Sequence, residues 1–332
     1  MTEFFDGLET RPQQEREQEQ LQSVINQVSL ARETAPAYQK RLAGINPRDI
    51  GNLAAICQIP ITRKSELIAL QHAEPPFGGF ATIRGPELTH IFASPGPIYE
   101  PGSKRPDFWR FARSLYAAGF RPGDLIHNCF SYHFTPAGMM VENGAHALGC
   151  SVIPAGVGQT ELQVQTIADL RPNGYVGTPS FLKIILDKAS ELGVDISSMN
   201  KALVSGEALP PSIRANFVER GIRIQQCYAT ADLGVIAYES SAQEGLIINE
   251  GLYLEIVRPG STETVADGEV GEIVVTSFNP DYPLIRFATG DLSAILPGQS
   301  PCGRSNKRIK GWMGRADQTA KVRGMFVHPE QV

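Results

Sequence analysis

The stretch GYVGTPSFLKIILDKASELGVDISSMNKALVSG, residues 174–206, decides the fold class of this chain. It begins with the short run 174–177 and ends with the run 201–206, and both runs consist mainly of small or apolar residues. Between them, apolar residues recur every three or four positions over 180–192, which is the spacing of an amphipathic helix. A strand, a helix and a second strand in this order predict a parallel sheet covered by helices.

The same alternation of short apolar runs with amphipathic stretches extends from about residue 88 to residue 235. The runs 125–126 and 149–154 are further expected strands, and 107–119 is a further expected helix. Sheets of this kind bind their ligands at the carboxyl ends of the strands. We therefore expect the loops that follow these runs to carry the chemistry.

The flanking segments have other patterns. Residues 21–28 carry one apolar stripe that predicts a helix, and Thr62 is expected to cap a later helix. Alternating apolar residues between 246 and 300 predict an antiparallel sheet or a small barrel. The expected divisions are a helical N-terminal arm (1–75), α/β lobes holding the site (76–245), a small β unit (246–312) and a hinge with the start of a lid (313–332).

Composition excludes several classes of protein. The 332 residues contain 30 Lys+Arg and 35 Asp+Glu, and this net charge of −5 argues against nucleic acid as a partner. No run approaches the roughly 20 apolar residues of a membrane helix, and the polar N-terminus is not a signal peptide. We therefore expect no membrane partner and a cytoplasmic protein. The 5 cysteines form no CxxC pair and are expected to be buried thiols.

Generic catalytic signatures are absent from the sequence. Residues 156–161 begin like a dinucleotide fingerprint but place glutamate where the third glycine belongs. The chain has no GxxxxGK[ST] loop, no HExxH motif and no GxSxG elbow. These absences argue against a nicotinamide enzyme, a P-loop nucleotidase, a zinc hydrolase and a serine hydrolase.

Four loops remain, and their order is more informative than any one of them. They are SGEALP at 205–210, YATAD at 228–232, RFATGD at 286–291 and GRADQTAKVRG at 314–324. A glycine loop and an aromatic ring can hold a flat base between them, and a carboxylate can accept both hydroxyls of a ribose. An arginine at a glycine turn can hold phosphate. Together these loops predict a nucleotide site.

In this order and spacing, the loops closely resemble the adenylate-forming superfamily, and specifically its phenylacetate–coenzyme A ligase branch. The resemblance spans nearly the whole chain. Further motifs that carry it are ETR at 9–11, GFRPGD at 119–124, FT at 134–135, GQTE at 158–161, TPS at 178–180, TGD at 289–291, CGR at 302–304, GRAD at 314–317 and FVHP at 326–329.

The resemblance implies the large N-terminal domain of an adenylate-forming enzyme, with two α/β lobes of mostly parallel sheets and a small β-barrel-like unit. It implies that a carboxylic acid and ATP give an acyl-adenylate and pyrophosphate, after which the thiol of coenzyme A displaces AMP. Because the substrate's own carboxylate is the first nucleophile, no serine or cysteine nucleophile is required. Positioning and charge stabilisation carry the rate.

The resemblance also assigns roles to residues of the loops. The residues implied to flank adenine are Ser205, Gly206, Glu207, Ala208 and Tyr228, with Ala229 beside them. Asp291 is implied to bind the ribose hydroxyls and Arg315 the ribose or a phosphate. Thr230 or Ala231 is implied to bind the α-phosphate, and Asp232 stands where the family's usual glutamate holds Mg²⁺. Thr230, Asp232 and Arg315 are thus the implied catalytic residues.

A second set of residues is implied to line the acyl pocket. These residues are Tyr132, His133, Phe134, Gly138 and Pro179. Tyr132, Phe134 and the pair Met139-Met140 predict an aryl or short branched acyl group, and His133 could hydrogen-bond a hydroxyl on it. Asp317 or Gln318 marks the implied hinge. The resemblance further implies pairing into a homodimer.

The sequence departs from the family at the loop expected to grip pyrophosphate. That loop should follow a strand at 90–92, but residues 93–102 read ASPGPIYEPG. The prolines remove amide donors, and Glu100 adds negative charge where pyrophosphate should rest, although Lys104 and Arg105 could compensate. A reshaped ATP grip and impaired adenylation both remain open.

Two further departures concern zinc and the lid. Relatives carry a zinc cluster near Cys302, but Ser300 stands where a second cysteine is expected, so no zinc is predicted. The family's C-terminal lid, which carries the adenylation lysine, is expected to be missing after Val332, so the chain is expected to bind nucleotide better than it turns it over. Three hypotheses follow: an acid–coenzyme A ligase, a ligase that loads a carrier protein, or a degenerate adenylate-binding protein without ligase activity.

Overall fold

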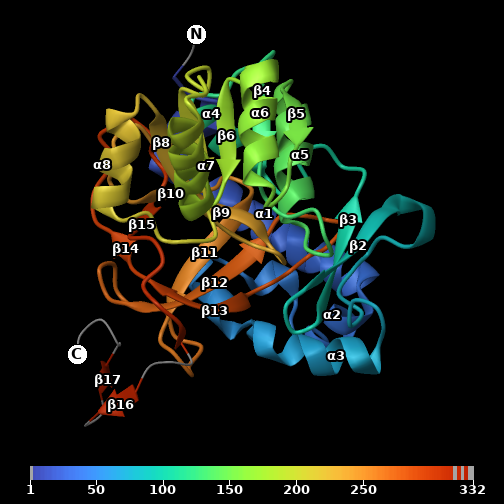
Figure 1. The fold of residues 1–332 in the computed structure, drawn as a ribbon. Coiled ribbons are helices and arrows are strands. Elements are labelled where there is room, and N and C mark those ends of the chain that lie inside the picture. The colour runs from blue at the N-terminus through green and yellow to red at the C-terminus, as the bar shows by residue number, and fades with distance from the viewer. Residues whose placement is uncertain (1–2, 317–319, 323–324, 328–332) are drawn as a thin grey trace. The chain divides into compact units, whose positions relative to one another are not determined.

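The computed structural model describes residues 3–316, 320–322 and 325–327, and these form two units (Figure 1). The first unit contains Phe92–Ser94 and Lys104–Asn249 with the described residues up to Asp6. The second contains Gly7–Ile91, Pro95–Ser103 and the described residues from Glu250 onward. In the part of the chain that the structure describes, no helix is both long and apolar enough to cross a membrane. The predicted segment boundaries at 75, 245 and 312 stay a proposal.

The first unit is a sheet of mainly parallel strands joined by helices. Its strands are β4 (Leu125–Asn128), β5 (Ser151–Pro154), β6 (Gly174–Gly177), β7 (Lys201–Val204), β8 (Arg223–Thr230), β9 (Gly234–Glu239) and β10 (Leu246–Ile248). Its helices are α4 (Phe111–Ala117), α5 (Ala137–Leu148), α6 (Thr160–Leu170), α7 (Pro179–Leu192) and α8 (Pro211–Glu219). The strand order is β10-β9-β8-β7-β6-β4-β5, parallel from β8 to β5, while β9 and β10 run antiparallel. The expected strands are confirmed.

Local sequence explains why α7 begins and ends where it does. Thr178 caps the helix because its Oγ1 accepts from the amide of Phe181 at 3.4 Å, and Pro179 occupies the first turn, where no amide donor is needed. Gly193, with φ of +66°, ends the helix in the left-handed conformation that glycine adopts without strain.

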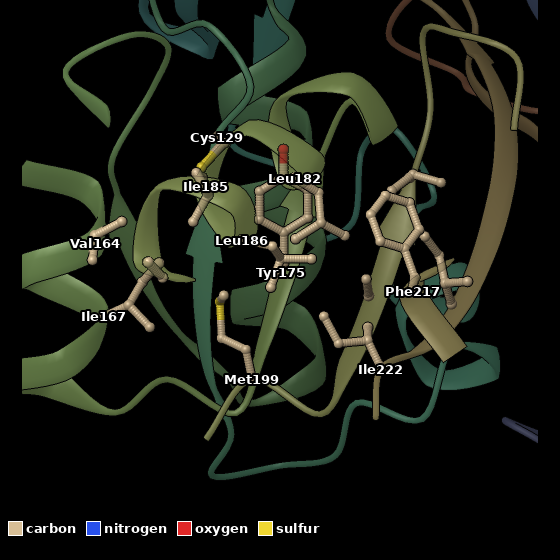
Figure 2. Close-up of a cluster of buried hydrophobic side chains, with 14 of the residues drawn as sticks. Cys129, Val164, Ile167, Tyr175, Leu182, Ile185, Leu186, Met199, Phe217 and Ile222 are labelled. Atoms are coloured by element: carbon tan, nitrogen blue, oxygen red, sulfur yellow. The ribbon is translucent and has the colours of Figure 1, made fainter. Parts of the chain in front are cut away.

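A buried apolar cluster joins three helices to this sheet (Figure 2). Its members include Val164 and Ile167 of α6, Leu182, Ile185 and Leu186 of α7, Phe217 of α8, and Tyr175, Val204 and Ile224 of the strands. Each such side chain stabilises the fold by about 1.5–3 kcal/mol when it leaves water. The Tyr175 hydroxyl donates to the Thr178 carbonyl at 3.0 Å. A Cβ at Gly177 would lie 2.3 Å from the Tyr175 hydroxyl oxygen. The glycine that ends β6 is therefore required by packing.

The second unit combines helices with an antiparallel sheet. Its helices are α1 (Gln13–Thr34), α2 (Pro36–Arg41) and α3 (Leu67–Ala73), with short 3-10 helices at Gly7–Thr10, Pro47–Asp49, Leu53–Gln58, Lys64–Glu66 and Gly85–Glu87. Its strands are β1 (Thr62–Arg63), β3 (Ile98–Ser103), β11 (Leu252–Val257), β12 (Gly271–Ser277), β13 (Phe287–Ser293), β14 (Ile295–Leu296), β15 (Arg308–Ile309), β16 (Ala320–Val322) and β17 (Met325–Val327); β2 (Leu88–Ser94) begins in this unit. The main sheet has the order β1-β13-β12-β11, and β11, β12 and β13 are antiparallel as predicted.

One expected helix cap is wrong. Thr62 lies in strand β1, where it pairs in parallel with Phe287, and its amide donates to the Arg286 carbonyl at 3.0 Å. Glu66 is the residue that precedes α3. A strand far along the chain therefore takes the Thr62 amide and leaves it fully buried instead of at a helix start. The predicted apolar stripe at 21–28 lies in α1, with Val24 and Val28 fully buried.

Strand β13 begins beside a buried ion pair. The Arg286 guanidinium binds both carboxylate oxygens of Glu255 at 3.0 Å and donates to the carbonyls of Cys57, Ile59 and Thr262 at 2.8–2.9 Å. All five N–H donors of the guanidinium are therefore bonded. Burial raises the pKa of Glu255 although Arg286 opposes that shift.

The residue before this arginine is tied to the N-terminal helices. The Tyr38 hydroxyl of α2 accepts from the amide of Ile285 at 2.7 Å. Burial raises the pKa of Tyr38 to about 12, so the hydroxyl stays neutral under ordinary conditions. The helices at the start of the second unit thus take part in holding β13.

Candidate functional site

In the first unit, the loop after β7 is bonded to strand β8. Ser205 Oγ donates to the backbone carbonyl of Cys227 at 2.7 Å, and Cys227 directly precedes Tyr228. Ser205 is buried, whereas Tyr228 and Ala229 are half-buried. Burial raises the pKa of the Cys227 thiol to about 12. The thiol therefore stays protonated and uncharged at neutral pH, and does not act as a nucleophile. The structure therefore brings Ser205 and the Tyr228 strand together.

The remainder of this loop is exposed and is held by the start of α7. Gly206 has φ of +81°, and an added Cβ would meet no atom closer than 3.8 Å, so the space beside this turn is open. The Glu207 carboxylate accepts from the Ser180 amide at 3.2 Å and its hydroxyl at 2.9 Å. Gly206, Glu207 and Ala208 thus line an exposed edge at the carboxyl ends of β6 and β7.

The turn between β8 and β9 holds Thr230 and Asp232. Thr230 Oγ1 accepts from the Leu233 amide at 3.2 Å, which closes the turn, and Asp232 is only 6% exposed. The Arg110 guanidinium stabilises the turn by donating a hydrogen bond to the Leu233 carbonyl. Burial lowers the pKa of Arg110 to about 10, so it remains a cation at neutral pH.

The expected acyl residues include a polar network around Tyr132. The Tyr132 hydroxyl donates to Glu142 Oε2 at 3.0 Å and accepts from Asn128 Nδ2 at 2.7 Å. The same amide nitrogen donates to the Gly138 carbonyl at 2.9 Å, and a Cβ at Gly138 would lie 2.7 Å from the Tyr132 ring. Glycine at 138 therefore lets this ring pack onto α5. Burial and the negative charge of Glu142 raise the pKa of Tyr132, which stays protonated.

His133 and Phe134 lie together on the loop after β4. Both are exposed, and their ring centroids are 4.6 Å apart. Phe134 adopts φ of +60°, and its carbonyl accepts from the Ala93 amide at 3.0 Å, which ties the end of β2 to this loop. Pro179 is buried at the start of α7. An aromatic side chain 69% exposed beside the carboxyl end of β4 is available to an apolar ligand.

The expected ribose residue lies in the second unit, on β13. Asp291 is 9% exposed, and its Oδ1 accepts from Arg315 Nη1 and from Trp312 Nε1, both at 3.1 Å. The Asp291 amide donates to Thr289 Oγ1 at 3.1 Å. The structure therefore joins two of the predicted residues, Asp291 and Arg315, through a direct ion pair. That Tyr228 of the first unit faces the same nucleotide stays a prediction.

The segment at the place of the expected phosphate loop is the turn of a hairpin together with its second strand. Strands β2 and β3 pair, and the turn at 95–97 contains two of the three prolines. Tyr99 of β3 exchanges backbone bonds with the side chain of Gln71 in α3, both at 2.8 Å. Glu100 is 1% exposed, so its carboxylate lies inside the protein, contrary to the expectation that it faces pyrophosphate.

The next expectations concern metal ligands, the cysteines and the hinge. In the described ranges, no group of three or more His, Cys, Asp or Glu side chains could hold a metal ion. Ser300 Oγ lies 3.0 Å from Cys302 Sγ.

The expectation of buried thiols is wrong for Cys57, which is exposed, and for Cys302, which is half-buried. Asp317 and Gln318 lie outside the described residues.

Sequence reasoning missed the partners that hold the predicted residues. Asn128 could have been found, because it is a polar residue at the carboxyl end of an expected strand. Glu142 and Trp312 gave no such signal, because a carboxylate on a helix and a tryptophan in a loop have many ordinary roles. Their contacts depend on which side chain the fold places opposite them.

Comparisons with known proteins identify the family. The model of the AMP-binding enzyme family matches residues 108–279. The phenylacetate-coenzyme A ligase of Aromatoleum evansii is 33% identical over 345 residues, which cover 99% of this chain and 77% of that protein. The chain belongs to the AMP-binding enzyme family. The family predicted from the order of the four loops is thereby confirmed.

Other relatives of this AMP-binding enzyme agree. The phenylacetate-coenzyme A ligase of Escherichia coli strain K12 is 32% identical over 346 residues. This match likewise spans 99% of this chain and 77% of that protein. A crystal structure of 2-hydroxyisobutyryl-CoA ligase in complex with 2-HIB-AMP and CoA superposes with a TM-score of 0.91 at 24% identity, and covers 99% of this chain and 76% of that one. The predicted α/β fold class is therefore confirmed.

Proposed function

We propose that this AMP-binding enzyme is an AMP-forming acid–coenzyme A ligase. The observation that carries the proposal is the 33% identity with a phenylacetate-coenzyme A ligase over 99% of the chain. The 2-hydroxyisobutyryl-CoA ligase whose fold the chain shares was captured with an acyl-AMP and with coenzyme A. The proposed ligands are therefore ATP, coenzyme A and a small carboxylic acid.

The proposed reaction has two displacements. In the first, a carboxylate oxygen of the acid attacks the α-phosphorus of ATP, and the bond to pyrophosphate breaks. In the second, the coenzyme A thiol loses its proton and attacks the acyl carbon, and the bond to AMP breaks. Neither displacement needs a protein nucleophile, which agrees with the neutral buried thiols of Cys129 and Cys227, whose pKa values are raised by burial. Positioning and charge stabilisation supply the rate.

We assign nucleotide binding to the two clusters described above. In the first unit, the exposed face of Gly206 and the ring of Tyr228 suit adenine, because a glycine turn lets a flat base approach the backbone. In the second unit, the Asp291 carboxylate suits the ribose hydroxyls, and Arg315 supplies a cation for ribose or phosphate oxygen. Thr230, at the β8–β9 turn, is the proposed α-phosphate donor.

Asp232 is the proposed ligand for Mg²⁺. The ion characteristically takes one or two carboxylates together with substrate phosphates and water, so one buried carboxylate at the Thr230 turn fits it. Bound there, Mg²⁺ would neutralise phosphate charge. Arg110 holds the backbone of this turn through the Leu233 carbonyl, and so keeps Asp232 in place.

We propose an aryl or short branched acid as the substrate. The exposed ring of Phe134 and the fixed ring of Tyr132 offer apolar surfaces, and the Asn128–Tyr132–Glu142 network gives one polar edge. Such a pocket accepts an apolar group and discriminates by hydrogen bonds at one side. His133 is the proposed partner for a hydroxyl on the acid.

One observation favours the alternative of a degenerate adenylate-binding protein. The hairpin formed by β2 and β3 presents prolines at its turn, and proline has no amide donor for a phosphate. On this alternative the protein binds AMP but does not exchange pyrophosphate with ATP.

Pyrophosphate exchange separates these functions. Exchange of labelled pyrophosphate into ATP that depends on an added carboxylic acid supports the ligase, whereas AMP binding without exchange supports the degenerate binder. A coenzyme A thioester as the product, instead of acyl transfer only to a phosphopantetheine carrier protein, separates the two ligases. Sedimentation of the purified protein tests the proposed homodimer.

A variant pair tests the ribose assignment. Asp291→Asn removes the charge that strengthens its hydrogen bonds to hydroxyls, so AMP should bind about 10- to 100-fold more weakly. Asp267→Asn is the matched control, because Asp267 is an exposed carboxylate of the same unit that pairs with Lys307 at the surface. Equal AMP affinity in the two variants would contradict the assignment.

A further inference from the structure

Trp312 lies in a short segment that is laid along β13. The amide of Met313 donates to the Leu292 carbonyl, and the Leu292 amide donates to the Gly314 carbonyl, both at 2.9 Å. Asp291 and Arg315 form an isolated antiparallel bridge at the end of this contact. The segment 311–315 therefore behaves as an added strand whose register against β13 is fixed.

This register delivers two donors to one carboxylate oxygen. Trp312 Nε1 and Arg315 Nη1 each lie 3.1 Å from Asp291 Oδ1. Two donors bonded to one oxygen restrict rotation of the carboxylate about its Cβ–Cγ bond. A Cβ at Gly290 would lie 2.8 Å from the Arg315 guanidinium, so glycine at this position leaves room for it.

Burial does not explain the tryptophan. The Trp312 side chain is 53% exposed, whereas Trp109, the other tryptophan of the chain, is 4% exposed and packs edge-on against Phe92 and Phe108. A half-exposed indole contributes only part of the stabilisation that a buried one supplies. The specific contact that Trp312 makes is the hydrogen bond from its indole nitrogen.

We propose that Trp312 is a positioning residue for nucleotide recognition, because its indole N–H holds the Asp291 carboxylate in the orientation that reads the ribose hydroxyls. The inference rests on the proposed function, in which Asp291 binds the ribose. Arg315 alone would let the carboxylate follow its guanidinium toward phosphate, and the second bond to the same oxygen, from Trp312, opposes that rotation. The chain thereby separates the phosphate contact of Arg315 from the sugar contact of Asp291.

The test compares AMP with its 2′,3′-dideoxy analogue. Trp312→Phe keeps an aromatic ring and removes the indole N–H, and Met313→Leu in the same segment is the matched control. Affinity for both nucleotides is measured by calorimetry, together with the thermal midpoint of each variant. The protein as it stands should prefer AMP by about 10-fold or more, because two hydroxyls bond to a charged acceptor.

The expected result is a loss of this preference. Trp312→Phe should lower the ratio of the two affinities to about one third or less, and should raise KM for ATP with little change in kcat, while the dideoxy analogue binds nearly as before. An equal weakening of both nucleotides, or an unchanged ratio, overturns the inference.

Asp291→Asn distinguishes this failure from failure of the proposed function. If Asp291→Asn abolishes the preference for AMP and Trp312→Phe retains it, the ribose assignment stands and the role of Trp312 is refuted. If the unchanged protein binds both nucleotides equally, the ribose assignment itself fails, and the inference fails with it.

Discussion

Replacing Arg286 with methionine removes the cation at the start of β13 and tests how far that strand depends on it. The change leaves the Glu255 carboxylate buried without its partner, which costs about 3–5 kcal/mol in comparable buried pairs. The carbonyls of Cys57, Ile59 and Thr262 also lose a donor, at about 1 kcal/mol each. Because such contributions overlap, we expect the second unit to lose about 5 kcal/mol of unfolding free energy.

A double-mutant cycle isolates the ion pair from the carbonyl bonds. Glu255→Leu alone leaves a buried guanidinium without its carboxylate and should also destabilise strongly. The double variant Arg286→Met/Glu255→Leu contains no unpaired charge, so it should be more stable than Arg286→Met alone. We expect a coupling energy of at least about 2 kcal/mol.

The pH dependence of the same variant provides an independent signature. Burial already raises the pKa of Glu255, and loss of Arg286 raises it further. The folded variant therefore binds a proton that the unfolded chain releases above about pH 4.3, so its stability falls as the pH rises. Acidification from pH 7 to pH 5 should recover part of the deficit relative to the unchanged protein.

Urea unfolding followed by hydrogen exchange in β12 and β13 measures these quantities for the second unit alone. A loss below about 1 kcal/mol in Arg286→Met would refute the reasoning, because a saturated and fully buried guanidinium cannot be removed so cheaply. A coupling energy near zero would show that the ion pair itself contributes nothing.

Two other changes test packing and protonation in the first unit. Gly234→Ala should lower the free energy of unfolding by about 2–4 kcal/mol, because φ is +73° and the new Cβ would lie 2.5 Å from the Trp109 carbonyl oxygen. Gly221→Ala, with φ of +80° and open space around it, should cost only about 1 kcal/mol. Chemical unfolding measures both losses. Equal losses in the two alanine variants would exclude the steric explanation. Burial lowers the pKa of His127, so the folded state binds fewer protons than the unfolded one and stability should fall as the pH drops below about 6.5. His127→Gln should flatten that decline in thermal midpoint between pH 7 and pH 5, and exposed His133→Gln should not; a decline that survives in His127→Gln would assign it to another group.

The strands of the first unit could be predicted because their signals are local. The run 174–177 becomes β6 with unchanged bounds, since Tyr175 folds beneath Gly177 and only glycine fits there. The helix that follows is set by Thr178 and Pro179 at its start and Gly193 at its end. Each of these signals lies within a few residues of the element that it defines.

Long-range pairing explains why the prediction for Thr62 failed. Thr62 has the side chain and spacing of a helix cap, but its amide is taken by a strand that begins at Phe287. Pro95 and Pro97, by contrast, lie in the turn between β2 and β3, two strands that are adjacent in the sequence. No pattern around Thr62 records the distant strand that decides its structure.

The sequence motifs of the candidate site could be predicted, but the side chains that hydrogen-bond to the motif residues could not. The order of the loops pointed to Asp291 and Arg315, and the structure pairs them. The indole bond from Trp312 depends on the register of 311–315 against β13, and the hydroxyl bond to Glu142 depends on how α5 faces Tyr132. Such supports are products of tertiary packing.

The bond between Tyr38 and the amide of Ile285 has a practical consequence for anyone who shortens this protein. A form that starts after residue 63 would expose that amide and would also lose β1, which pairs with β13, the strand that carries the proposed ribose residue Asp291. Proteolytic removal of residues up to β1 should therefore weaken the proposed nucleotide binding although it removes none of the proposed ligand contacts. Preparations intended for binding work should keep those residues intact.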